Sequence, residues 1–345
     1  MSLFEELSRK ACRLGVPLSV QLDLTWRCNE RCVHCYLDHK DCGELSTAEV
    51  KGLLEQLEQA KVFELLISGG EPLLRPDLFE ILEYARALLF NVKLKTNAVL
   101  IGEQEAARFA ELNLEQVQIS IYSHRPEIHD AITRLPGSLE SSLAATRLLK
   151  KQDVRVAFTN ILMKQNLSDY QGVRELARNL GVECRFDPTV TPKLDGDRTP
   201  LDLRVSSEEL KDIFHKQDLV GDVDEFCRPP LPVDSSVLED YPCSAGHTAC
   251  YVSPCGDVFP CIQFPLLSGN IRRQNFSDIW KDSPQLAEVR AVRARDLPVC
   301  SACVHVAGCE RCPGLAYIEG DLRGISPLDC EKVNVRTGIP PGTRR

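Results

Sequence analysis

Apolar and polar residues alternate in short runs through the first half of the chain, and a segment with helical spacing follows each run. The first run, 18–24, alternates Leu18, Val20, Leu22 and Leu24 with Ser19, Gln21 and Asp23. This period of two residues predicts a β-strand. An apolar run predicts a second strand at 62–68, and the recurring unit predicts strands at 92–96, 117–121, 154–161 and 182–186. Helical spacing predicts helices at 4–14, 76–89, 103–112 and 138–151.

Two further helices are predicted from their first residues. Ser46 is followed three residues later by Glu49, which predicts a capped helix to about residue 60, and Ser168 is followed in the same way by Gln171. Strands that alternate with helices indicate βαβ units and a parallel sheet. Six such units, with polar residues after the strands, favour an α/β fold with a partial (β/α)6 TIM-like barrel. A doubly wound sheet is the alternative that the pattern leaves open.

The second half of the chain has a different composition. Proline-rich stretches flank one predicted helix at 206–217, a hairpin is expected where 250–253 and 258–260 surround Pro254-Cys255-Gly256-Asp257, and a helix is expected at about 277–294. We therefore expect an N-terminal helix at 1–16, a barrel at 17–190, a linker at 191–242, a small cysteine-rich domain at 243–335 and a tail at 336–345.

Charge and composition narrow the class of protein. A net charge of −9 and a pI near 5.4 give no basic surface for nucleic acid. The sequence shows neither an export signal nor an apolar run of membrane-spanning length, so we expect a cytoplasmic protein without a membrane partner. Sixteen cysteines in a reducing compartment point to metal binding or catalysis rather than to disulfides.

Cys28, Cys32 and Cys35 follow the first predicted strand with the spacing C-x3-C-x2-C. Thiolates are the ligands of iron–sulfur clusters, and three of them leave one iron of a four-iron cluster open to another ligand. The alternative is a structural zinc ion, which requires a fourth protein ligand. His34, His39 and Cys42 are the candidates for that ligand.

This motif, followed by Tyr36, resembles that of the radical S-adenosylmethionine (SAM) enzymes, in which SAM binds the open iron. The resemblance extends to the ends of later strands. It implies that Gly69, Gly70 and Glu71 bind the SAM amino group, that Thr96, Asn97 and Ser120 line the SAM site, and that Arg134, within 129–138, pairs with the SAM carboxylate. Adjacent glycines allow close backbone approach, and an arginine fork suits a carboxylate.

A second set of cysteines resembles the SPASM domain, a twitch-type extension of radical SAM enzymes that modify peptides and proteins. The resemblance implies one auxiliary 4Fe–4S cluster on Cys300, Cys303, Cys309 and Cys330, and a second on Cys243, Cys261 and Cys312. Two residues instead of the usual three precede Cys312, and two zinc ribbons are the alternative. Cys250 is the first candidate for the fourth ligand of the second cluster, with Cys255 or Cys227 as alternatives; otherwise one iron stays open.

The resemblance implies an oxidoreductase that cleaves SAM reductively to a 5′-deoxyadenosyl radical, which takes a hydrogen atom from a peptide or protein side chain. Crosslinking, oxidation and epimerisation are the expected outcomes. The chain is more similar to the maturases of the pyrroloquinoline-quinone type than to the sulfatase maturases. The sulfatase maturases have an acidic residue directly after the closing cysteine of the hairpin, and this chain has Ile262 at that position.

We also expect a flavodoxin or ferredoxin as electron donor. About seventeen residues precede the first strand, so we expect a separate peptide-recognition protein. Two rival hypotheses remain: radical SAM chemistry on a tetrapyrrole side chain, and a non-catalytic iron–sulfur or zinc protein.

Overall fold

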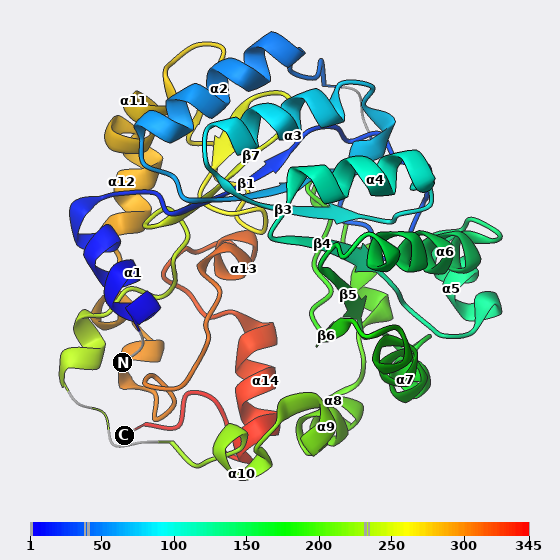
Figure 1. Cartoon of the computed structure of the whole chain (residues 1–345). Coiled ribbons are helices and arrows are strands. Elements are labelled where there is room, and N and C mark those ends of the chain that lie inside the picture. The colour runs from blue at the N-terminus through cyan, green and yellow to red at the C-terminus, as the bar shows by residue number, and fades with distance from the viewer. Residues whose placement is uncertain (1–2, 38, 40–41, 231–232, 234, 345) are drawn as a thin grey trace.

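The computed structural model describes residues 3–37, 39, 42–230, 233 and 235–344. Its centre is one open sheet of nine strands in the order β6-β5-β4-β3-β2-β1-β7-β8-β9. Strands β1 to β6 are parallel neighbours in chain order. In Figure 1, helices α2, α3, α4, α6 and α7 form an arc outside this sheet. Helices on one face and strands in chain order confirm the partial barrel and exclude the doubly wound sheet.

The six predicted strands and the five predicted helices between them are all present. The strands are β1 (Ser19–Asp23), β2 (Glu64–Ser68), β3 (Asn91–Thr96), β4 (Gln116–Ser120), β5 (Val156–Ile161) and β6 (Glu183–Asp187). The helices are α2 (Thr47–Gln59), α3 (Leu78–Ala87), α4 (Glu103–Leu112), α6 (Ser138–Lys151) and α7 (Tyr170–Leu180), and α1 (Leu3–Leu14) precedes them. One short helix between β4 and α6, α5 (Pro126–Thr133), was not predicted.

The structure confirms some of the predicted helix ends and corrects others. Ser46 and Glu49 form the predicted capping box of α2. The prediction for Ser168 is wrong, because this residue lies in a 3-10 turn, Leu167–Asp169, and Asp169 precedes α7. The helix predicted at 206–217 ends earlier, as α8 (Ser207–Phe214), and α9 (Gln217–Val220) and α10 (Val223–Phe226) follow it.

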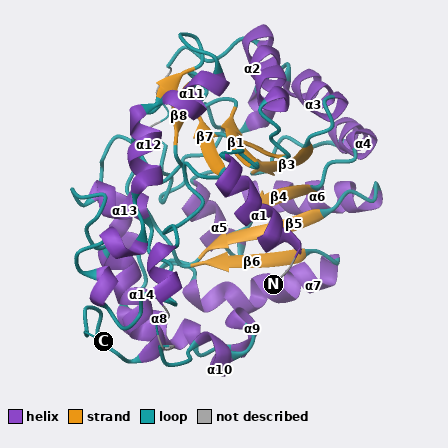
Figure 2. Cartoon of the chain, turned by 90° about the vertical axis from the view of Figure 1, so that its left-hand side faces the viewer, coloured by secondary structure: helices purple, strands orange, loops and turns teal. Residues whose placement is uncertain are grey.

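The two faces of the sheet have different chemistry. Val20, Leu22, Val92 and Leu94 belong to the main hydrophobic core. Residues with the opposite strand parity, including Gln21, Lys95, Ser120, Thr159 and Asp187, line an internal cavity instead. Alternation along each strand therefore separates a packed outer face from a polar inner face. Figure 2 shows β4, β5 and β6 side by side.

The hairpin predicted in the second half of the chain extends the same sheet. It consists of β7 (Ala249–Val252) and the antiparallel β8 (Asp257–Phe259), followed by β9 (Gly269–Asn270). Strand β7 pairs in parallel with β1, with Ser19 opposite Ala249 and Leu22 opposite Val252. The second cysteine region is thus connected to the first strand of the barrel by backbone hydrogen bonds.

The remaining helices follow the hairpin. They are α11 (Phe276–Asp282), α12 (Pro284–Ala291), α13 (Pro313–Ile318) and α14 (Pro327–Thr337), and α13 and α14 lie across from β4 to β6 in Figure 1. The single helix expected at 277–294 is interrupted at Ser283, because a residue before proline avoids the helical conformation. Short 3-10 turns lie at Pro72–Leu74, Thr199–Leu203, Ser235–Glu239, Ala294–Asp296 and Cys300–Ala302.

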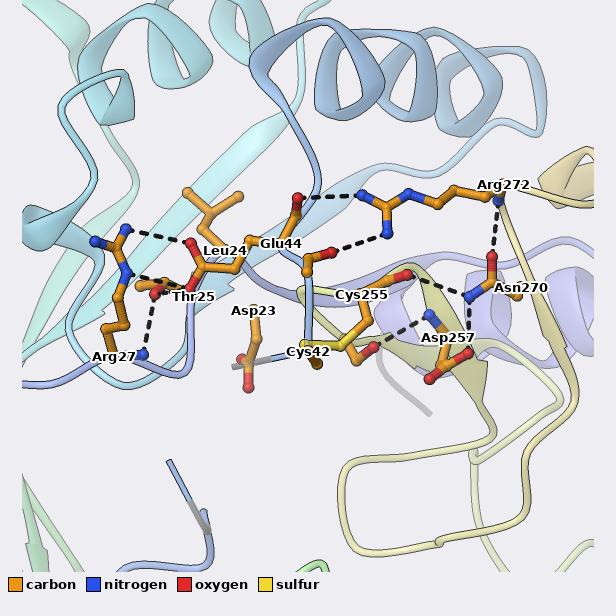
Figure 3. Close-up of a disulfide and its surroundings, with 12 residues drawn as sticks. Asp23, Leu24, Thr25, Arg27, Cys42, Glu44, Cys255, Asp257, Asn270 and Arg272 are labelled. Atoms are coloured by element: carbon orange, nitrogen blue, oxygen red, sulfur yellow. Dashed lines mark hydrogen bonds and ion pairs between the residues drawn. A yellow bond between two sulfur atoms is a disulfide. The ribbon is translucent and has the colours of Figure 1, made fainter. Parts of the chain in front are cut away.

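A disulfide joins the segment after the first cysteine motif to the hairpin. Cys42 and Cys255 are bonded, with Cα atoms 5.7 Å apart and 213 positions of sequence between them (Figure 3). Arg272 reinforces the junction by donating to the carbonyl oxygens of Gly43 at 2.8 Å and Glu44 at 3.1 Å. This pair is an exception to the expectation that the cysteines bind metal, and it removes Cys42 from the candidates for a zinc ligand.

Candidate iron–sulfur and SAM site

The loop that carries Cys28, Cys32 and Cys35 leaves the carboxyl end of β1 and borders a cavity of about 330 Å³. All three cysteines line this cavity. So do most of the other residues predicted for the SAM site, which are Tyr36, Gly69, Gly70, Thr96, Asn97 and Ser120. The carboxyl ends of parallel strands meet at one edge, which explains why residues from four strand ends gather here.

Backbone hydrogen bonds hold the cysteine loop on two sides. On one side, Arg31 N donates to Thr133 O at 3.0 Å and Val33 N donates to Ile132 O at 2.9 Å. On the other side, Gly70 N donates to Thr25 O at 2.7 Å. The loop therefore depends on the end of α5 and on the turn after β2, neither of which is adjacent to it in sequence.

Gly69 and Gly70 line the cavity and also pack closely against the cysteine loop. A Cβ atom on Gly69 would lie 2.2 Å from Thr25 O, and one on Gly70 would lie 2.3 Å from Arg27 O. Gly69 also has φ of +138°, a conformation that favours glycine. The glycines thus allow the cysteine loop to pass closely, and the approach of a ligand to them stays a prediction.

Glu71 is fully buried and does not line the cavity. Its carboxylate accepts from Thr96 Oγ1 at 2.8 Å, Asn97 N at 2.8 Å and Leu73 N at 3.0 Å. Burial raises the pKa of Glu71 to about 7, although these donors lower it. In this arrangement Glu71 fixes the end of β3, and it reaches the cavity only through Thr96 and Asn97.

The three thiols have the chemistry that an iron–sulfur cluster requires. Burial raises the pKa of Cys28, Cys32 and Cys35, so the thiolates need a nearby cation such as iron. Cys28 Sγ accepts from Glu30 N at 3.4 Å and lies 3.9 Å from Asn97 Nδ2. Hydrogen bonds to sulfur are among the features that set a cluster's potential. These residues therefore fit the cluster.

A single metal ion fits less well. No three His, Cys, Asp or Glu side chains in the described ranges are grouped as ligands of one ion. Four zinc ligands converge to about 2.0–2.3 Å from one point.

Arg134, like Glu71, is a predicted residue that does not line the cavity. It follows α5 in a left-handed conformation with φ of +57°, its side chain is exposed, and it does not line the cavity. The segment around it has a structural function instead, since Asp130 accepts from Gly137 N at 2.6 Å and Leu139 N at 3.1 Å. The sequence pattern located a segment that supports the cysteine loop, and the pairing of Arg134 with the SAM carboxylate stays a prediction.

Several residues of the cavity were not predicted. Gln21, Lys95 and Asp187 project from the inner face of the sheet, and Ile262 and Gln263 come from the second cysteine region. Burial lowers the pKa of Lys95. The strand alternation contained a signal for the first three, because they share the inward parity of Ser120; no local pattern indicated the other two.

The auxiliary cysteines form two groups in space. Cys300, Cys303, Cys309 and Cys330 line one cavity of about 310 Å³. Burial raises the pKa of Cys243 and of Cys261, and the charge of the Cys312 thiolate raises both further, so these three thiols lie near one another. Backbone N–H groups donate hydrogen bonds to the thiols of this second group; for example, Ala245 N donates to Cys243 Sγ at 3.3 Å. Both groups fit thiolate-bound clusters, and they match the division implied by the resemblance.

The cysteines considered for the fourth position differ in where they lie. Cys255 is ruled out by its disulfide with Cys42. Cys250 is buried on β7 at the edge of the main hydrophobic core, where burial and, to a smaller extent, the charge of the Cys261 thiolate raise its pKa, so it stays the first candidate. Cys227 packs against a separate cluster around Phe214 and donates to Phe214 O at 3.4 Å.

Known proteins share these features. Residues 23–177 match the radical SAM superfamily, and residues 243–304 match SPASM, an iron–sulfur cluster-binding domain. Mycofactocin maturase MftC of Mycobacterium tuberculosis is 30% identical over 309 residues, which cover 86% of this chain and 78% of that protein. PqqA peptide cyclase of Xanthomonas campestris is 30% identical over 343 residues, covering 94% and 89%.

An AdoMet-dependent heme synthase of Methanosarcina barkeri is 28% identical over 328 residues, covering 88% of this chain and 93% of that protein. Among solved structures, Streptococcus suis SuiB bound to its precursor peptide SuiA has a TM-score of 0.75 at 18% identity, covering 95% of this chain and 82% of that one. At this identity the likeness concerns the fold.

The chain belongs to the radical SAM superfamily and carries a SPASM domain. It is an enzyme, and its cofactors are a 4Fe–4S cluster with SAM and auxiliary iron–sulfur clusters. No described helix has the length and apolar character needed to span a membrane.

Proposed function

We propose that this enzyme is a maturase that modifies a side chain of a ribosomally made peptide. The observation that carries the proposal is that two relatives with 30% identity over most of their length are a mycofactocin maturase and a PqqA peptide cyclase. Crosslinking, oxidation and epimerisation are the candidate outcomes.

In this proposal Cys28, Cys32 and Cys35 hold the SAM-binding cluster, and Tyr36, Gly69, Gly70, Thr96, Asn97 and Ser120 surround SAM. When bound, the cluster supplies the electron for reductive SAM cleavage, which yields the radical that takes a hydrogen atom from the substrate. Gly69, Gly70 and Glu71 position the cysteine loop and the end of β3, and the cavity walls exclude water.

A peptide is a better-supported substrate than a macrocycle, because the relatives of 30% identity are a mycofactocin maturase and a PqqA peptide cyclase. The heme synthase relative, at 28% identity, keeps a tetrapyrrole substrate as the second candidate. Tight binding of an iron porphyrin by the reconstituted enzyme would favour that candidate.

The electron source and the way in which the peptide is recognised complete the proposal. A flavodoxin or ferredoxin donates the electron, and a separate recognition protein presents the peptide. A precursor peptide that this chain captures alone in a pull-down would argue against the recognition protein.

The test begins with anaerobic reconstitution, dithionite and SAM. We expect 5′-deoxyadenosine from the enzyme and from a Cys12→Ala control, and only background amounts from Cys32→Ala. Short peptides encoded beside the gene are then added one at a time, and a mass change that requires SAM and reductant identifies the substrate. SAM cleavage without any peptide modification, together with porphyrin conversion, would overturn the peptide proposal while leaving the radical SAM chemistry intact.

A further inference from the structure

One buried arginine lies in the link between the two auxiliary cysteine groups. Only Glu310 and Arg311 separate Cys309, which is assigned to one group, from Cys312, which is assigned to the other. This is the place at which the spacing of the chain departs from the usual SPASM pattern. The Arg311 side chain is only 6% exposed, so its charge is enclosed by the second cysteine region.

Main-chain carbonyl groups hold the guanidinium of Arg311 in place. Its Nη2 atom donates to Leu322 O at 2.6 Å and to Gly324 O at 2.7 Å, and its Nε atom donates to Gly324 O at 3.0 Å. Cys261 and Cys300, one from each group, pack against the hydrophobic cluster that contains Leu322. The fold therefore fixes this cation near members of both groups.

One nitrogen of the guanidinium has no partner. The Nη1 atom is buried and makes no hydrogen bond with the described residues, and none of their carboxylates forms an ion pair with Arg311. A buried cation without an anion is costly, so the site requires a negative charge. Arg311 lines the cavity of about 310 Å³ together with Cys300, Cys303, Cys309 and Cys330. A cluster bound by these four thiolates would supply both negative charge and sulfur atoms that accept hydrogen bonds.

The pKa values of the thiols agree with this placement. Burial raises the pKa of Cys300, and the charge of Arg311 lowers it. Burial also raises the pKa of Cys330 and of Cys312, and the same charge lowers both. Arg311 thus favours the thiolate form in each group.

We propose that Arg311 raises the reduction potential of the auxiliary cluster bound by Cys300, Cys303, Cys309 and Cys330, with Nη1–H donating to a sulfur of that cluster. The inference rests on the proposed assignment of these four thiols. Hydrogen bonds to sulfur are among the features that set a cluster's potential. A nearby positive charge favours the reduced state, because that state carries one more negative charge. Arg311 therefore makes this cluster easier to reduce.

The test measures the clusters directly and needs no substrate. Changing Cys28, Cys32 and Cys35 together to Ala removes the first cluster, so that this parent protein holds two auxiliary clusters with about eight irons. In this parent we compare Arg311→Gln, which removes the charge, with Arg311→Lys, which keeps it. The measurements are iron content and redox titration followed by electron paramagnetic resonance (EPR). Arg323→Gln is the matched control, because it removes a charge from the segment that holds Arg311, although the Arg323 side chain is 42% exposed.

We expect Arg311→Gln to keep about eight irons. At a given potential it should lower the ratio of reduced to oxidised protein about tenfold for one cluster, which corresponds to about 59 mV. Arg311→Lys should shift the potential less, and Arg323→Gln should leave it unchanged. The cluster that shifts should be the one whose signal is missing from Cys309→Ala with Cys330→Ala.

A second measurement uses the parent itself. When its arginines carry a heavy nitrogen isotope, pulsed EPR of the reduced protein should detect a coupling between one cluster and an arginine nitrogen. Arg311→Lys should abolish this coupling, because lysine carries no isotope. The result does not depend on whether Arg311→Gln assembles its clusters.

Three results would overturn the inference. One is that no arginine nitrogen couples to a cluster in the parent, or that the coupling survives in Arg311→Lys. Another is that Arg311→Gln titrates like Arg323→Gln, or that Arg311→Lys shifts as far as Arg311→Gln. The third is that the shifted signal persists in Cys309→Ala with Cys330→Ala. If Arg311→Gln loses iron, the isotope coupling alone decides. A parent with only about four irons would overturn the assignment of the thiols, whereas about eight irons without the coupling concern Arg311 alone.

Discussion

The two cysteine regions of this enzyme are built in opposite ways. Cys28, Cys32 and Cys35 lie within eight residues at the end of one strand, so one loop supplies every thiol. The auxiliary thiols are spread from Cys243 to Cys330, and their groups interleave, because Cys312 joins Cys243 while Cys309 joins Cys330. A local motif can thus define the first site, whereas the second exists only after distant turns have packed together.

The largest expected effect tests this interleaving. Reconstituted enzyme should hold about twelve irons as three cubane clusters. Cys309→Ala with Cys330→Ala should remove about four irons, because both residues serve one cluster. Cys312→Ala with Cys330→Ala should remove about eight irons, because these two residues serve different clusters although they are closer to each other in sequence than Cys309 and Cys330 are. Equal iron loss in the two double variants would break the proposed division, and Cys12→Ala with Cys184→Ala serves as control.

The disulfide is the covalent connection between the two regions. Cys42→Ser or Cys255→Ser opens a loop of 213 residues and should lower the free energy of unfolding by about 2–4 kcal/mol, since the unfolded chain loses a constraint. Chemical denaturation of the apoprotein without reductant measures the loss. With dithiothreitol, wild type should fall to the level of both variants, and a wild type as stable in reductant as without it would contradict the prediction.

Gly70 tests how tightly the barrel packs around the first cysteine loop. Gly70→Ala places a Cβ atom 2.3 Å from Arg27 O and should cost about 1–3 kcal/mol of stability. Gly52→Ala is the matched control, because nothing lies within 4 Å of the added atom on helix α2. That substitution should raise stability by about 0.5–1 kcal/mol. Thermal denaturation compares the two, and similar melting temperatures would argue against close packing at Gly70.

Glu71 should give the smallest effect, on the pH dependence of apoprotein stability. Burial raises its pKa from 4.5 to about 7, so between these values the folded state keeps a proton that the unfolded state releases. Its contribution to stability is therefore complete below pH 4.5 and is lost as the pH rises to about 7, by at most about 1.4 kcal/mol per unit.

Glu71→Gln should flatten that slope in urea denaturation across this range, whereas the exposed Glu103→Gln should leave it unchanged. An unchanged slope in Glu71→Gln would show that other buried acids account for the dependence.

The amino-acid sequence alone was sufficient to predict those features that depend on neighbouring residues. Strand periodicity located all six barrel strands, and the Ser46 capping box located α2. The cysteine spacings and the Gly69-Gly70 turn led to the family. In each case neighbouring residues determine the result, either through the side-chain period of a strand or through the reach of one short loop.

Other features depend on contacts between distant segments, and only the tertiary structure decided them. No local pattern predicted that β7 pairs with β1, that Cys42 bonds to Cys255, or that Arg134 faces outward. The close packing of Gly70 against the backbone of Arg27 was likewise visible only in the structure. Gln263 lies beside Cys312 because Gly314, which has no side chain, leaves room for the Gln263 backbone. This contact joins two distant chain segments, so the sequence of either segment alone does not predict it.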